Sequence, residues 1–90
     1  MDLEKDVILV GIKPGSVYAF AVKTIFDNGE EEVIIKARGK QILKAINLVE
    51  FMKRNGQLEI KEITTGNEKY NGKDEREVYI SSIEIKVVKR

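Results

Sequence analysis

The feature that most constrains this fold is a pattern that occurs twice, a short apolar run followed by an amphipathic segment. Val7–Val10 and Val33–Ile35 are rich in β-branched residues, and each precedes a turn and a stretch with apolar residues at helical spacing. Such runs predict strands buried on both faces. The order strand, helix, strand, helix implies a parallel strand pair, because each helix carries the chain back across the sheet.

The two predicted helices have recognisable ends. Residues 13–16 (KPGS) place a proline in the first helical turn, where its missing N–H is harmless, and Asn28-Gly29 is a stop signal. The second helix follows Gly39 and ends at Asn55-Gly56. The predicted core faces are Val17, Phe20, Ala21 and Ile25, broadened by Tyr18, Val22 and Phe26, in the first helix, and Ile42, Ala45, Ile46, Val49 and Met52 in the second.

The last third of the chain predicts a hairpin. Residues 58–63 and 79–87 alternate like half-buried strands, and the polar segment 66–77 between them contains the turn signal Asn71-Gly72. Each alternation changes phase once, which indicates a β-bulge or a strand leaving the core. The predicted class is α+β: a two-layer β-α-β-α-β-β fold with a mixed four-stranded sheet, two helices and a long protruding hairpin. Residues 1–90 would form one domain, with 1–6 as a flexible start.

Composition excludes several kinds of chemistry. The 90 residues contain no Cys and no His, so disulfides, thiolate nucleophiles and the commonest general base and metal ligand are absent. Catalysis would have to rely on carboxylates, Lys, Tyr or Ser, which makes an enzyme a minority hypothesis. The acidic start and the lack of a long apolar run predict an intracellular, soluble protein. No cofactor or small-molecule substrate is expected.

One segment carries unbalanced positive charge. The chain has 16 Lys and Arg against 15 Asp and Glu, yet no acid lies in residues 33–49. In a parallel strand pair, both strands end at the edge where both helices begin, so Lys13 should approach this segment. Helix N-termini with Lys and Arg are suited to phosphate. The alternative is a solvated basic face without a partner. The cations in the segment are Lys36, Arg38, Lys40 and Lys44.

Weaker candidates lie elsewhere. Tyr18 would either stack on a base or pack at the helix edge. The hairpin tip contains three cations, Lys69, Lys73 and Arg76, against four acids, so it would either reach a nucleic-acid groove or be a solvated turn. The acidic run 30–32 favours a solvated surface over a metal site.

The sequence resembles the Alba family of small archaeal chromatin and RNA-binding proteins. The resemblance covers about residues 7–88. It is carried by Gly11-x-Lys13-Pro14, Tyr18, the block 32–40 (EVIIKARGK), Ile42-x-Lys44-Ala45, the segment 60–63 and the closing 82–85.

The resemblance implies a homodimer that binds double-stranded DNA and RNA with little sequence preference and compacts or protects it on the chromosome. It implies backbone contacts by Lys13, Arg38 and Lys40, and secondary contacts by Tyr18, Lys73 and Arg76. Three features depart from the family pattern: Ile12 replaces a lysine that is acetylated in relatives, the segment after the second helix is shortened to residues 55–57, and the hairpin is rich in acids.

Three alternatives stay open on the sequence alone. The chain could be an RNA-binding subunit of an RNA-processing particle. It could be a protein-interaction module whose basic face meets an acidic partner. It could be a carboxylate-dependent nuclease, for which cleavage in the presence of Mg²⁺ would be the evidence.

Overall fold

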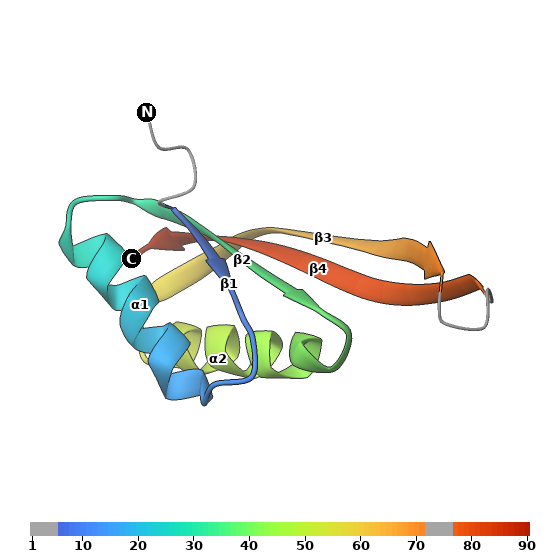
Figure 1. Ribbon diagram of the computed structural model, residues 1–90. Coiled ribbons are helices and arrows are strands. Elements are labelled where there is room, and N and C mark those ends of the chain that lie inside the picture. Colours follow the sequence, from blue (N-terminus) through green and yellow to red (C-terminus); the bar gives the residue numbers. More distant parts are fainter. Residues whose placement is uncertain (1–5, 72–76) are drawn as a thin grey trace.

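A computed structural model describes residues 6–71 and 77–90, the side chains of 70 and 71 excepted. Figure 1 shows a sheet with both helices on one side and a hairpin that extends beyond them. The elements in chain order are β1 (Val7–Leu9), α1 (Gly15–Asp27), β2 (Glu32–Arg38), the short 3₁₀ helix η1 (Gly39–Gln41), α2 (Ile42–Arg54), β3 (Leu58–Asn71) and β4 (Glu77–Lys89).

The four strands form one mixed sheet in the order β1-β2-β4-β3. β1 runs parallel to β2, with Val7 opposite Ile34, whereas β4 is antiparallel to both β2 and β3. The predicted α+β class, the parallel pair and the terminal hairpin are therefore confirmed. The parallel pair matters for the site, because it brings the ends of β1 and β2 and the starts of both helices to one edge.

The core lies between the sheet and the helices. Alternate residues of the central strands face it, because side chains along a strand point to opposite sides in turn. Val33, Ile35 and Ala37 of β2 are buried, with relative exposures of 0%, 0% and 1%. From β4 and the helices, the buried partners are Ile83, Ile85, Val87, Val22, Phe26, Ala45, Leu48, Val49 and Met52.

The prediction that the first strand, now β1, is buried on both faces is wrong. Leu9 of β1 is 62% exposed, although its neighbours Ile8 and Val10 are buried. In the part of the chain that the structure describes, both helices cover the same face of the sheet, and the opposite face is left open (Figure 1). A continuous apolar run therefore does not show by itself that both faces of a strand are covered.

The predicted helix faces are partly right. In α1, Val22 and Phe26 are buried and Tyr18 and Ile25 pack against the core, but Phe20 is 72% exposed. In α2, Ala45, Val49 and Met52 are buried as predicted, together with Leu48, which the prediction omitted. Two further predicted core residues also lie at the surface, Val17 at 44% and Ile46 at 37% exposure.

The hairpin leaves the core in the way that the phase changes indicate. The β3–β4 register shifts between Ile60 and Glu62, which is the predicted bulge. On β4, burial moves from even to odd positions at Ser82–Ile83, where the strand passes from the outer arm to the core. The turn signal at Asn71-Gly72 extends beyond the described residues. No helix within the described ranges is long and apolar enough to cross a membrane.

Candidate nucleic-acid interface

The candidate interface lies at the edge of the sheet where β1 and β2 end. A loop of residues 10–14 joins β1 to α1, and Gly39 joins β2 to η1 and α2. Gly39 has φ +55°, a backbone conformation that costs glycine little and other residues more. It allows the chain to turn from the strand directly into the helical segment, so that Arg38 and Lys40 lie on either side of a sharp bend.

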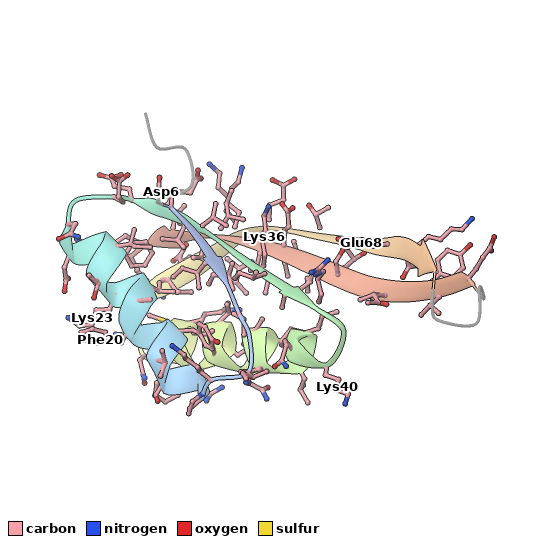
Figure 2. All side chains as sticks on the ribbon, viewed as in Figure 1. Asp6, Phe20, Lys23, Lys36, Lys40 and Glu68 are labelled. Atoms are coloured by element: carbon pink, nitrogen blue, oxygen red, sulfur yellow. The ribbon has the colours of Figure 1, made fainter. Side chains whose placement is uncertain are left out.

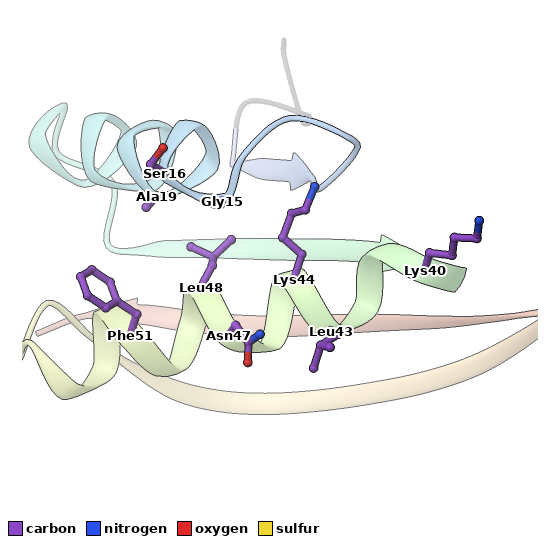
Figure 3. Close-up of a pocket in the computed structure, with 9 residues that line it drawn as sticks. All are labelled: Gly15, Ser16, Ala19, Lys40, Leu43, Lys44, Asn47, Leu48 and Phe51. Carbon is purple, nitrogen blue, oxygen red and sulfur yellow. The ribbon is translucent and has the colours of Figure 1, made fainter.

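The Lys44 side chain connects the start of α2 to the loop after β1. Its Nζ lies 2.8 Å from the carbonyl oxygen of Gly11 and 2.6 Å from that of Lys13, so the ammonium group donates hydrogen bonds to both. Figure 3 shows the Lys44 side chain reaching from α2 toward the loop after β1. Lys44 was predicted to contact phosphate, and that role stays a prediction. In the structure its charge is used to position the loop that carries Lys13.

Tyr18 contacts the same loop. Its side-chain oxygen accepts a hydrogen bond from the backbone N–H of Lys13 at 3.2 Å, and its ring packs partly against the core. The Tyr18 oxygen lies so close to Gly11 that a Cβ added to this glycine would be only 3.1 Å from it. Of the two roles predicted for Tyr18, the geometry matches packing at the helix edge. Base stacking by Tyr18 stays a prediction.

Lys13 and Lys40 are the cations at this edge whose ammonium groups have no partner among the described residues. Both are exposed, and no ion pair within residues 6–71 and 77–90 joins either to a carboxylate. Lys40 lies in η1, directly before α2, where the helix dipole disfavours a cation and favours an anion. A phosphate group placed here would interact favourably with both lysines and with the helix N-termini.

Lys36 and Arg38 point to the other side of the sheet. Because Val33, Ile35 and Ala37 face the helices, the alternate positions of β2 face away from them. In Figure 2, Lys36 and Glu68 lie on the side of the sheet opposite α2, whereas Lys40 lies beside the helical layer. The predicted cation cluster is therefore divided between two sides of the sheet.

Both outward cations have a carboxylate partner. Lys36 Nζ lies 3.6 Å from Oε2 of Glu84, the residue directly opposite it on β4. The nitrogen Nη1 of Arg38 lies 2.8 Å from Oε1 of Glu68 on β3. Sequence reasoning missed these partners, because they come from strands far along the chain. The strand register alone pairs Lys36 with Glu84, so a correct register would have revealed that contact.

A hollow of about 820 Å³ extends from the end of β2 to the outer half of the β3–β4 hairpin. It brings Arg38 and Lys40 into one surface with the hairpin residues Glu68, Lys69 and Tyr79. Lys69 is paired with Glu77 at 3.0 Å, and Tyr79 is 60% exposed. Lys69 is one of the hairpin cations that the sequence offered as groove contacts, whereas Tyr79 was not predicted as a contact. The two predicted site residues of the hairpin, Lys73 and Arg76, lie outside the described residues.

A second hollow, of about 650 Å³, lies between the two helices and has a mainly apolar lining (Figure 3). Its α2 side includes Leu43, which is 65% exposed, and Phe51, which is 51% exposed. Lys40 borders this hollow as well as the one beside the hairpin, so the charged edge and the apolar face of α2 are continuous.

Comparisons with known proteins agree with this architecture. The Alba family model matches residues 6–67. The DNA/RNA-binding protein Alba of Methanothrix thermoacetophila is 39% identical over 84 residues, which are 91% of this chain and 93% of that protein.

Among solved structures, Alba from Thermoplasma volcanium aligns with a TM-score of 0.83 and 36% identity, over 92% of this chain and 99% of that one. ALBA1 from Trypanosoma brucei aligns with a TM-score of 0.81 and 27% identity, over 98% of this chain and 72% of that one. None of these three relatives has the name of an enzyme. With the family model matching most of the sequence and a relative of this identity along nearly its whole length, the chain belongs to the Alba family.

Proposed function

We propose that this protein binds double-stranded DNA and RNA through their backbone phosphates, as a homodimer and with little sequence preference. The observation that carries the proposal is the edge formed by the ends of β1 and β2. There, Lys13 and Lys40 are exposed beside the starts of the two helices and have no carboxylate partner among the described residues. The name of the Methanothrix relative, a DNA/RNA-binding protein, supports nucleic acid as the ligand.

The cations of the interface differ in what their charged groups already contact. An exposed cation without a partner gains the most from a phosphate, since no internal pair has to be broken first. Lys13 and Lys40 are of this kind, whereas Lys36 and Arg38 each have an acid beside them. We therefore place the first phosphate contacts at Lys13 and Lys40. Contacts by Lys36, Arg38, Lys44, Lys73 and Arg76 would add to them once the nucleic acid is bound.

Little sequence preference is expected, because phosphate contacts position a nucleic acid without reading its bases. The helices offer no base-reading surface at this edge, since they present their starts to it rather than a long side. The corresponding cellular role is that of an architectural protein that compacts or protects nucleic acid on the chromosome.

The apolar outer face of α2 supports the dimer. Leu43, Ile46 and Phe51 are exposed on this helix, and Ile63 of the neighbouring edge strand β3 is 53% exposed. Ile63 is paired with the buried Ile85, so it lies on the same side of the sheet as α2. Exposed apolar side chains grouped in this way mark interaction surfaces. A second copy of the chain would cover them and would place two charged edges on one assembly.

A salt titration tests the phosphate contacts. Three to five contacts per protomer give about 6 to 10 in a dimer, so the logarithm of the binding constant should fall with the logarithm of salt concentration with a slope near −0.9 times that number. Duplex DNA, duplex RNA and a structured RNA should be compared at one salt concentration. A flat salt response would contradict the proposal, as would an unchanged slope in an Arg38→Ala, Lys40→Ala double variant.

A further inference from the structure

Arg38 is already bound to an anion of its own chain. Its guanidinium reaches past the intervening strand β4 to Glu68 on β3, with Nη1 and Oε1 2.8 Å apart. The register places Arg38, Ser82 and Gly66 in one row across three strands, and Glu68 lies two residues beyond Gly66 on β3, opposite Ile80. Charged hydrogen bonds of this length are the strong kind that arginine also forms with phosphate.

The Arg38–Glu68 ion pair lies where Glu68 can compete with a ligand for Arg38. Both side chains remain more than half exposed, at 57% and 52%, and both border the hollow that also contains Lys40 and Lys69. The Glu68 carboxylate therefore occupies, at the Arg38 guanidinium, the position that a phosphate oxygen of bound nucleic acid would take. Because an exposed ion pair is only marginally stable, an external anion in sufficient local density can displace it.

We propose that Glu68 sets the affinity and selectivity of this interface by occupying Arg38 until closely spaced phosphates displace it. The inference rests on the proposed function, since it concerns the same phosphate-binding edge. Lys13 and Lys40 hold the nucleic-acid backbone first, and the backbone then brings a further phosphate to Arg38. A single isolated anion lacks this assistance, so Glu68 favours polymeric nucleic acid over mononucleotides and inorganic phosphate.

Glu68→Gln is the direct test, because it removes the charge and keeps the shape of the side chain. We expect this variant to bind a short DNA duplex of mixed sequence about two- to fivefold more tightly than the unmodified protein, the range that an exposed ion pair is worth. The gain should be relatively larger for inorganic phosphate, which has no neighbouring contacts to assist it. Thermal melting should be nearly unchanged, since the pair is exposed.

Asp27→Asn is the matched control. Asp27 is paired with Lys23, which lies outside the proposed interface, its side chain is 60% exposed, and its replacement removes the same unit of negative charge. The decisive measurement is a double-mutant cycle, in which Glu68→Gln is made both in the unmodified protein and in an Arg38→Ala background. If Glu68 acts through Arg38, its removal should increase affinity only when Arg38 is present.

Three outcomes would overturn the inference. An equal gain from Asp27→Asn, or a gain from Glu68→Gln that persists in Arg38→Ala, would show that only the overall charge matters. An unchanged affinity of Glu68→Gln, with the unmodified protein binding duplex normally, would show that Glu68 does not limit access to Arg38 and would leave the proposed function intact. Absence of duplex binding by all variants at low salt would refute the proposed function itself, and the inference with it.

Discussion

The ammonium nitrogen of Lys44 lies 2.6 Å from the carbonyl oxygen of Lys13, and this contact joins the first turn of α2 to the loop that enters α1. The charged group of Lys44 thereby holds the backbone that carries Lys13. Lys44 also donates a hydrogen bond to the carbonyl of Gly11, so two carbonyl groups of the loop are held by one side chain.

Lys44→Met should loosen the loop of residues 10–14. The substitution keeps most of the side-chain length but removes two charged hydrogen bonds, each worth about 1.5–3 kcal/mol at most. We expect the protein to lose about 1–3 kcal/mol of unfolding free energy and the loop amides to exchange hydrogen faster. Lys53→Met on the same helix is the control, because no described residue pairs with Lys53. Equal stability of the two variants would contradict the positioning role of Lys44.

Lys13→Ala and Lys40→Ala should each reduce nucleic-acid affinity and also its salt dependence. Each lost phosphate contact should make the log–log slope shallower by about 0.9, and a dimer would lose two contacts per substitution. Fluorescence anisotropy at several salt concentrations measures both quantities. Lys23→Ala is the control, since Lys23 lies on α1 and is paired with Asp27 at 3.0 Å. A slope that changes as much in this control would place the phosphate contacts elsewhere.

Leu43→Asp combined with Phe51→Asp should separate the proposed dimer. Both side chains are more than half exposed in the single chain, so the substitutions leave the monomer folded and place charge where a second copy would bury apolar surface. Light scattering should show a mass close to that of one chain, against twice that value without the substitutions. Phe20→Asp, at 72% exposure on α1, is the control. Should the double variant keep the mass of the unmodified protein, this face of α2 is not the dimer contact.

Ile35→Ala and Leu9→Ala should differ strongly in stability. Ile35 is fully buried between the sheet and the helices, so its truncation should cost about 2–5 kcal/mol through lost burial and the cavity left behind. Leu9 lies on the open face of the neighbouring strand, and its truncation should change the free energy of unfolding by only about 0.5 kcal/mol. Chemical denaturation compares the two. A large loss with Leu9→Ala would mean that the outer face is covered in solution.

Much of the fold could be predicted because its signals are local. The helix ends at Asn28-Gly29 and Asn55-Gly56 agree with the observed C-caps, and the positive φ of Gly29 and Gly56 explains why glycine follows each helix. The bulge was indicated by a change of alternation, which is also local. Which side of an element is covered is not local. The exposed Leu9 and Phe20 were predicted to be buried, because an apolar residue gives the same sequence pattern whether or not another layer of the fold covers it.

The sequence by itself determined the order of elements, the parallel pair and the list of cations near one edge, since each follows from spacing and from the way a helix returns the chain. Only the tertiary structure decided what each cation contacts. It left Lys13 and Lys40 without carboxylate partners among the described residues, turned Lys44 toward the loop carbonyls and paired Arg38 with Glu68. The physical reason is distance along the chain. Arg38 and Glu68 are 30 residues apart, and only the strand order of the folded sheet brings their charges together.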